Sequence, residues 1–140
     1  MPSLQVLVDA DNVAPSRLQP VLAVLSEIES VELTASGRSE ALDALDWPPH
    51  AHLLPSSGWQ RADVALAEAY VPSTAPLLLV TGDGDFGLLA ARHAGPVLVV
   101  SGAPSGRLRD HAVVVDPAID GVEPVRQWLI ATGVVAPPSS

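Results

Sequence analysis

The sequence lacks cysteine and lysine altogether, and it holds one phenylalanine and one tyrosine in 140 residues. Without cysteine there is no disulfide framework, thiolate metal site or thiol nucleophile, so any metal must be held by oxygen or imidazole ligands. The seven basic side chains are all arginines, and the formal net charge is -9. Such a chain cannot coat nucleic acid through a broad basic surface, and it has few rings for base stacking. A nucleic-acid substrate would have to be gripped locally.

Long apolar runs are also missing. None approaches the length needed to cross a bilayer, and the amino terminus lacks the basic and apolar regions of a signal peptide. We therefore expect a cytoplasmic protein with no membrane partner. The length fits a single domain over residues 1–134, followed by a flexible tail at 135–140. The three tryptophans are expected to be core anchors, with a homodimer surface as the alternative: Trp47, Trp59 and Trp128.

What the sequence does contain is a regular alternation of apolar runs and amphipathic segments. Strands are expected at 4–8, 31–35, 52–54, 77–80, 96–100 and 113–115, and helices near 15–28, 39–45, 59–70, 86–93 and 122–131. This alternation is typical of a parallel sheet covered on both faces. We predict an α/β fold, a Rossmann-like three-layer α/β/α sandwich with a mainly parallel sheet of five or six strands, and with 77–80 in a central position. Two details are specific: Pro20 should fall in the first turn of its helix, and Gly95 should be a left-handed cap.

Two aspartate clusters directly follow apolar runs. One is Asp9-Ala10-Asp11-Asn12 and the other is Gly82-Asp83-Gly84-Asp85. Ligands of parallel sheets bind beyond the carboxyl ends of the strands, so Asp9, Asp83 and Asp85 can converge there if their strands are neighbours. Asp63, near the start of a helix, supplies a plausible fourth carboxylate. Because four carboxylates without a cation would repel one another, the set predicts a hard divalent ion such as Mg²⁺.

Simpler interpretations exist for some polar residues. Asp11 and Asn12 can form a turn or cap the first helix, and Asp85 can cap the helix that follows it. The four histidines show no metal-binding spacing and are expected at the surface or in packing. No Gly-x-Ser-x-Gly, Gly-x-Gly-x-x-Gly or Walker pattern is present, so a serine hydrolase or a nucleotide-cofactor enzyme has no support.

Four segments together carry a known pattern. They are Val8-Asp9-Ala10-Asp11-Asn12, Ala62-Asp63-Val64-Ala65-Leu66, Thr81-Gly82-Asp83-Gly84-Asp85-Phe86 and Gly95-Pro96-Val97-Leu98-Val99-Val100. In order and spacing they resemble the NYN domain, a branch of the PIN-like nucleases, from Leu4 to about Val115. The resemblance implies a metal-dependent ribonuclease, an endonuclease rather than an exonuclease, that acts on single-stranded RNA with Mg²⁺ or Mn²⁺ at Asp9, Asp63, Asp83 and Asp85. It also implies that Asn12 and Thr81 contact phosphate or a metal-bound water.

The chain departs from this pattern in its basic residues. Gln60 stands where many relatives have a lysine three residues before the helical aspartate, and the neighbouring Arg61 is the candidate substitute. Later, Ser105 and Leu108 fit the pattern, but Asp110 is displaced. Arg107 and Arg109 are our candidates for holding RNA phosphate, against the interpretation that they are ordinary surface arginines.

Two other functions stay open on the sequence. The opening cluster also resembles haloacid-dehalogenase-like phosphatases, with Asp9 as nucleophile and Asp11 as acid/base. The lysine that such chemistry needs near the phosphoryl group is missing. A NYN-like module that binds a metal, a nucleotide or a protein without cleaving RNA is the second alternative, because the -9 charge disfavours a polyanion and fold alone does not establish activity.

Overall fold

The structure is a computed structural model that describes residues 4–56, 62–81, 86–102 and 112–137, with only the backbone described at 62 and 63. Six parallel strands form one sheet in the order β3-β2-β1-β4-β5-β6. The strands are β1 Leu4–Asp9, β2 Val31–Gly37, β3 His52–Pro55, β4 Leu77–Val80, β5 Val97–Val100 and β6 Val113–Val115. The helices are α1 Pro15–Leu25, α2 Ser39–Asp43, α3 Ala62–Ala69, α4 Gly87–Arg92, α6 Pro117–Asp120 and α7 Glu123–Ala131. The predicted α/β fold is confirmed.

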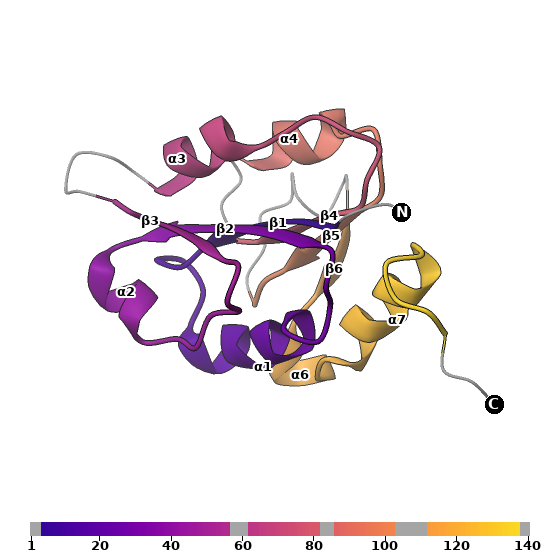
Figure 1. Ribbon diagram of the computed structural model, residues 1–140, viewed down its shortest axis with the longest axis horizontal. Coiled ribbons are helices and arrows are strands. Elements are labelled where there is room, and N and C mark those ends of the chain that lie inside the picture. The colour runs from indigo at the N-terminus through magenta and orange to yellow at the C-terminus, as the bar shows by residue number, and fades with distance from the viewer. Residues whose placement is uncertain (1–3, 57–61, 82–85, 103–111, 138–140) are drawn as a thin grey trace.

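Helices cover both faces of the sheet. Figure 1 shows α3 and α4 on one face, and α1, α6 and α7 on the other. Strand side chains alternate between the two faces, so the central strands β1, β4 and β5 each contribute to two separate cores. The larger core contains Leu4, Val6 and Val8 of β1 under α1 and α7, and the smaller contains Leu7 with Leu66 of α3.

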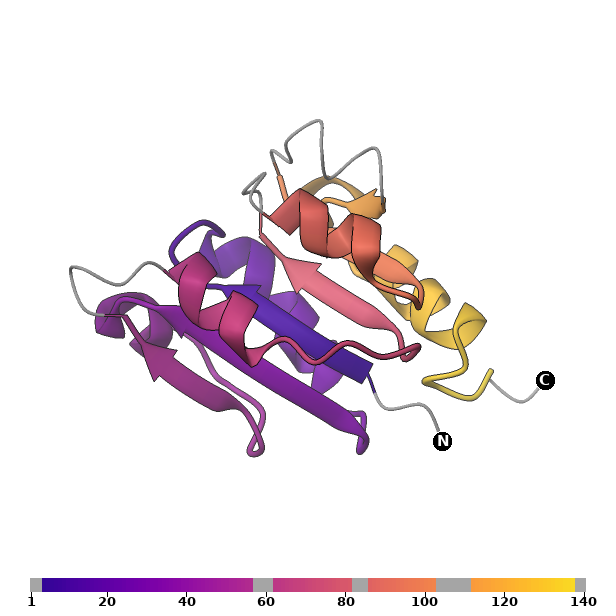
Figure 2. The same ribbon diagram turned by 90° about the horizontal axis from the view of Figure 1, so that it is seen from above.

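The chain reverses its direction of strand addition between β1 and β4. From β1 it adds β2 and β3 on one side, and it then returns to add β4, β5 and β6 on the other (Figure 2). β4 is therefore central, as expected, and its four residues are all buried. In open parallel sheets the crevice for ligands opens beyond the carboxyl ends of the strands at this reversal. Here that place lies beyond Asp9 and Val80, where both aspartate clusters begin.

Helix α1 contains a proline in its interior. Pro15 opens the helix, but Pro20 is its sixth residue, not part of its first turn as the sequence suggested. A proline there removes one backbone hydrogen bond and crowds the preceding turn. The helix continues because five of its eleven residues, Leu18, Val21, Leu22, Val24 and Leu25, are buried against the sheet. Tertiary packing outweighs the local preference.

The prediction that Gly95 is a left-handed helix cap is wrong. Helix α4 ends at His93 with an extended backbone, and among the described glycines only Gly121 and Gly133 have positive φ. A Cβ on Gly95 would instead lie 2.4 Å from the carbonyl oxygen of Thr74 and 2.6 Å from that of Ala75. Gly95 is thus required by the close approach of two backbones, not by a left-handed turn.

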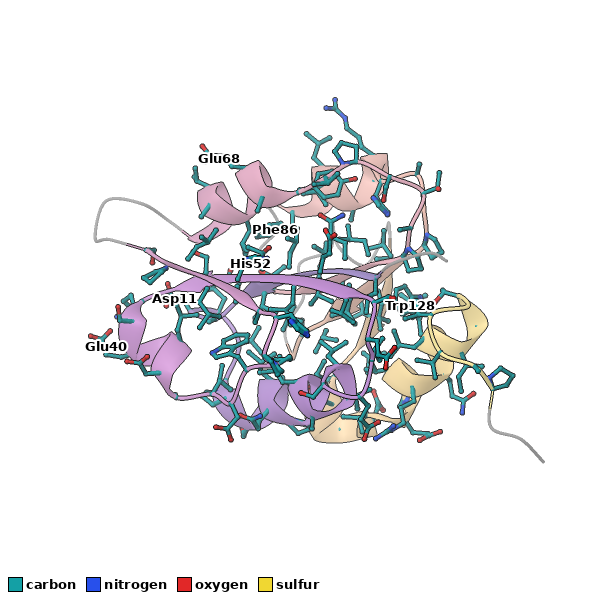
Figure 3. All side chains as sticks on the ribbon, viewed as in Figure 1. Asp11, Glu40, His52, Glu68, Phe86 and Trp128 are labelled. Carbon is teal, nitrogen blue, oxygen red and sulfur yellow. The ribbon has the colours of Figure 1, made fainter. Side chains whose placement is uncertain are left out.

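Two tryptophans pack against the core, as expected. Trp47 and Trp128 are partly buried beside the larger cluster, and Trp47 Nε1 donates to the carbonyl of Leu42 at 2.8 Å. Trp128 is a residue of α7 (Figure 3). Trp59 lies outside the described residues. Val135, the first residue of the expected tail, also packs there and donates its N–H to Leu129 at 3.2 Å. No helix in the described ranges is long and apolar enough to span a bilayer.

Candidate functional site at the carboxyl edge of the sheet

A row of polar residues crosses the carboxyl edge of the sheet at a single register. Asp9 is paired with Ser36 of β2, and Thr81 and Ser101 follow directly on the last paired residues of β4 and β5. The exposed fractions are 0% for Asp9 and Ser36, 1% for Thr81 and 4% for Ser101. Four buried polar residues in adjacent strands are uncommon in an otherwise apolar sheet, since buried polar groups need compensating bonds. They mark the edge at which a ligand site is expected.

Asp9 is the charged member of this row. Its Oδ2 accepts a hydrogen bond from Asn12 Nδ2 at 2.5 Å and another from Thr81 Oγ1 at 3.2 Å. Asn12 is held by a turn, in which its N–H donates to the carbonyl of Asp9 at 3.3 Å. Hydrogen bonds to a charged group contribute roughly 1.5–3 kcal/mol each. These two donors fix the orientation of the carboxylate before any ligand arrives, and both were singled out from the sequence.

Asp9 and Thr81 face helices α3 and α4. Each lies two residues after a leucine of the smaller core, Leu7 and Leu79, so alternation puts their side chains on the same face. Helix α3 packs against β1 and β2. Asp63 is the second residue of α3, and it therefore belongs to the helix that covers the face of Asp9. The placement of the helix is compatible with the predicted fourth carboxylate.

Asp11 is directed elsewhere. Its Oδ1 accepts from the backbone N–H of Arg38 at 2.9 Å and lies 3.5 Å from Arg38 Nε. Arg38 is the N-cap residue that directly precedes α2. The corresponding residue before α1 is Ala14, and no side chain caps that helix. Of the two simpler interpretations of Asp11, a turn or a cap on the first helix, the turn is present and the cap is wrong: Asp11 stabilises the start of α2 and holds the loop after β1 against the loop after β2. A carboxylate at a helix start also interacts favourably with the helix dipole.

An ion pair between Arg17 and Asp116 lies at the carboxyl ends of β5 and β6. Arg17 Nε donates to Asp116 Oδ1 at 2.7 Å and Arg17 Nη2 to Oδ2 at 3.4 Å, with side chains 29% and 13% exposed. Asp116 also caps α6, because its Oδ1 accepts from Ala118 N at 3.0 Å. The hydrogen bond from Arg17 holds the pKa of Asp116 below its usual value. A Cβ on Gly102 would lie 2.4 Å from Arg17 Cζ, so the guanidinium lies directly on the backbone after β5.

Several predicted site residues fall outside this description. Asp83, Asp85, Arg61, Arg107 and Arg109 lie outside the described residues, and for Asp63 only the backbone is described. Among the side chains that are described, no three acidic or histidine groups come close enough together to hold a metal ion. The four-carboxylate site therefore stays a prediction, of which Asp9 is the described member.

The histidine expectation can be checked at His93. It is 7% exposed, its Nδ1 lies 2.6 Å from Tyr70 Oη and its Nε2 lies 2.6 Å from the carbonyl oxygen of Ala75. The carbonyl oxygen can only accept, so Nε2 donates to it, and in the neutral ring Nδ1 is then left to accept from the tyrosine hydroxyl. Burial raises the pKa of Tyr70. His93 is thus a packing residue, as expected.

Sequence reasoning missed four residues of the edge. Ser36 follows the expected strand 31–35 and Ser101 follows the expected strand 96–100, just as Asp9 and Thr81 follow theirs, and that shared position was the available signal. Arg17 and Asp116 are 99 residues apart in the sequence, and no local pattern links them.

The comparisons with known proteins bear on the fold. No family model matches the sequence, and no curated protein matches it. Among solved structures, the chain resembles the crystal structure of a protein of unknown function from Vibrio parahaemolyticus, with a TM-score of 0.55 and 21% identity. The match covers 82% of this chain and 93% of the other. It supports the general α/β class.

Proposed function

We propose that this chain is a metal-dependent ribonuclease of the NYN, PIN-like type that hydrolyses phosphodiester bonds in single-stranded RNA. The observation that carries the proposal is Asp9, a fully buried carboxylate at the end of a central strand, oriented by Asn12 and Thr81. It lies beside the reversal of strand order, where ligands of open parallel sheets bind. A buried carboxylate in such a place is costly unless a function or a cation compensates it.

The residues present fit a hard divalent cation. Asp9 offers a carboxylate, and Asp83 and Asp85 follow β4, the strand next to it. Asp63 begins a helix that packs on β1 and β2. Oxygen ligands of this kind suit Mg²⁺ or Mn²⁺, and the chain has no thiolate that would favour a softer metal. We assign these four aspartates to the metal, directly or through waters.

The proposed roles divide between the metal and the chain. A divalent ion held by Asp9, Asp63, Asp83 and Asp85 would supply an activated water and charge neutralisation at the leaving oxygen. Thr81 and Asn12 hold Asp9 in one orientation, while Arg61, Arg107 and Arg109 are assigned to RNA phosphate. The contacts of Asp11 with Arg38 favour this assignment over a phosphatase, in which Asp11 would need to exchange protons with substrate.

A matched pair of variants tests the proposal. Asp9→Asn and Asp11→Asn remove the same charge two residues apart, but only Asp9 belongs to the proposed metal site. We expect Asp9→Asn to lower Mn²⁺-dependent cleavage of labelled single-stranded RNA by at least roughly 100-fold, since even indirect changes around a metal cost 10–100-fold. Asp83→Asn should behave in the same way, while Asp11→Asn should retain most of the activity.

A second measurement separates binding from turnover. Mn²⁺ at about 100 times its dissociation constant should stabilise the folded wild type by about 2.7 kcal/mol, which is a rise in Tm of roughly 5–10 °C for a domain of this size. Asp9→Asn should abolish that rise, and Asp11→Asn should keep it. A rise in Tm without any cleavage would support the non-enzymatic alternative, and hydrolysis of a small phosphomonoester that disappears in Asp11→Asn would support the phosphatase.

A further inference from the structure

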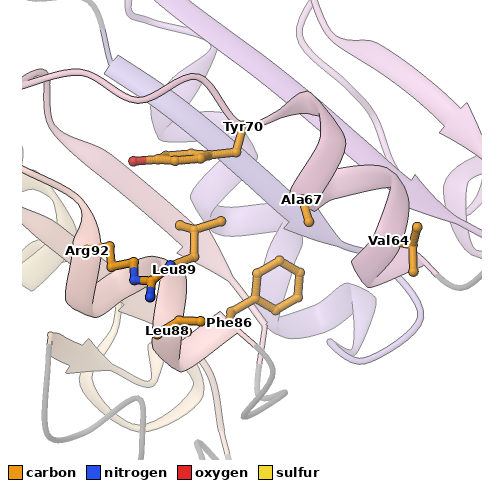
Figure 4. Close-up of a pocket in the computed structure, with 7 residues that line it drawn as sticks. All are labelled: Val64, Ala67, Tyr70, Phe86, Leu88, Leu89 and Arg92. Atoms are coloured by element: carbon orange, nitrogen blue, oxygen red, sulfur yellow. The ribbon is translucent and has the colours of Figure 1, made fainter.

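An apolar groove lies between α3 and α4 on the face of the sheet that Asp9 also faces. Its volume is about 400 Å³, within the range of roughly 300–1,000 Å³ that is usual for small-molecule sites. Helix α3 and the residue after it form one wall, and α4 with Phe86 directly before it forms the other (Figure 4). The principal lining residues are Val64, Ala67 and Tyr70 on one wall and Phe86, Leu88 and Arg92 on the other.

The groove begins with residues that directly follow two of the aspartates assigned to the metal. Val64 follows Asp63 directly in the sequence, and Phe86 follows Asp85. Both walls are short helices in which each residue advances about 1.5 Å, so the groove extends on the order of 10 Å away from the ends of α3 and α4 that adjoin these aspartates. A polymer whose scissile bond lies at the metal would have its neighbouring unit at the groove.

Rigid aromatic side chains form part of the groove. It contains the only phenylalanine and the only tyrosine of the chain. Phe86 is 3% exposed, and the hydroxyl of Tyr70 is bound to His93 at 2.6 Å, with the two rings edge to face at 5.7 Å. In contrast, Val64 and Leu88 are 52% and 59% exposed, so both walls also present apolar surface to solvent. A flat apolar ligand fits between such walls.

Arg92 gives the groove its charge. Four arginines lie in the described part of the chain, and three of them are ion-paired with Asp116, Asp11 and Glu27. Arg92 is the one without a carboxylate partner among the described residues, and its side chain lines the groove (Figure 4). In a chain with a net charge of -9, an arginine left free beside an apolar groove is suited to an anion linked to an apolar group.

We infer that this groove binds one unpaired base of the RNA next to the cleaved bond, with Arg92 on the adjoining phosphate. The inference rests on the proposed ribonuclease function for its substrate, and it adds the site that holds the base. A base supplies the flat apolar group, and its phosphate supplies the negative charge. Specificity for single strands follows, because a paired base cannot enter a groove between two helices.

The test combines protein and RNA changes. Leu88→Asp places a charge in the groove at an exposed position, and Val64→Asp does the same from the other wall. Ile119→Asp is the matched control, because Ile119 is an 80% exposed apolar residue on α6, across the sheet. Each protein is titrated by fluorescence anisotropy with a labelled nine-nucleotide single-stranded RNA and with a set of the same RNAs that each lack one base. Thermal melting of every variant confirms the fold.

For the wild type we expect one abasic position to weaken binding by roughly 5- to 150-fold, the usual effect of one stacked base. In Leu88→Asp and Val64→Asp the intact RNA should bind more weakly and that abasic penalty should vanish, while Ile119→Asp should match the wild type. An equal abasic penalty in all four proteins would overturn the inference. So would a dimeric wild type that Leu88→Asp converts to a monomer in sedimentation, which would make the groove an interface between copies. All titrations are made without divalent cation, so binding is measured without turnover. A wild type that shows the penalty but cleaves no RNA once Mn²⁺ is added would contradict the ribonuclease and keep the base site.

Discussion

At the scale of single residues, Asp116 joins three parts of the carboxyl edge with one carboxylate. It begins α6 by accepting from Ala118 N, and it binds Arg17 of α1, whose guanidinium lies on the backbone of Gly102. The register of β5 and β6 places Asp116 beside Ser101, because the two directly follow the paired residues Val115 and Val100. The described backbone after β5, Ser101 and Gly102, is therefore fixed in place.

The charge of Asp116 should make the free energy of unfolding depend on pH, and Asp116→Asn should remove that dependence. Asparagine keeps the cap on α6, because it is as good a cap as aspartate, but it loses the ion pair with Arg17. The pKa of Asp116 is lowered in the folded state, so its contribution is present above the unfolded value of 3.8 and is lost as the pH falls through the folded value. Urea unfolding of both proteins should show a clear deficit for Asp116→Asn near about pH 6 that shrinks toward about pH 3. A deficit independent of pH would mean that the ion pair contributes nothing.

How far the site could be predicted from sequence depends on how local each residue's signal is. Asp9 and Thr81 follow directly on apolar runs and are brought together by strand order, while Asn12 reaches Asp9 through the turn after β1. Asp11 occupies the same kind of position, yet its partner is Arg38 of a later loop, and the pairing of β1 with β2 decides that contact. Contacts that depend on strand order cannot be read from neighbouring residues alone.

At the scale of elements, strands were easier to predict than helix ends. A buried parallel strand is a short, nearly continuous apolar run. Leu77–Val80 and Val97–Val100 are apolar at every position and are bounded by proline and glycine in the sequence, which indicates strands. The short helix α6 was not predicted, because its four residues follow β6 without a hydrophobic period and are specified by the Asp116 cap and Pro117. Capping chemistry is visible in a sequence only when the end of the preceding strand is known.

Helix α1 provides a test of how packing overrides local preference. Pro20 is exposed at the sixth position of the helix, where it forfeits one backbone hydrogen bond, while Pro15 at the first position forfeits none. Interior proline is about 3 kcal/mol worse than alanine, and the more flexible unfolded chain returns up to about 1 kcal/mol of this. We expect Pro20→Ala to raise the free energy of unfolding by about 1–2 kcal/mol. Pro15→Ala should leave it unchanged, and urea titration measures both. A loss of stability in Pro20→Ala would show that α1 needs the bend that the proline imposes.

At the scale of the whole molecule, an acidic chain is proposed to bind a polyanion. The formal charge is -9, and three of the four arginines that the structure describes are ion-paired. Long-range attraction is therefore weak, and affinity must come from the metal, from local arginines and from contacts with the bases. Discrimination against double-stranded nucleic acid is a consequence, because a duplex offers mainly its phosphates to a surface of this charge.

The salt dependence of RNA binding measures this balance. At most four arginines, Arg61, Arg92, Arg107 and Arg109, are left for phosphate after the three ion-paired ones are set aside. Since each phosphate contact to a single strand contributes about 0.7 to the slope of log K against log salt, the slope should be about -3 or shallower. It is measured by anisotropy with Asp83→Asn protein, so that the RNA is not consumed. In that background Arg92→Gln should make the slope shallower by about 0.7, whereas Arg126→Gln, which removes an arginine paired with Glu27, should leave it unchanged. A slope much steeper than -3 would require a basic surface that this chain does not possess, and an unchanged slope in Arg92→Gln would remove Arg92 from the path of the RNA.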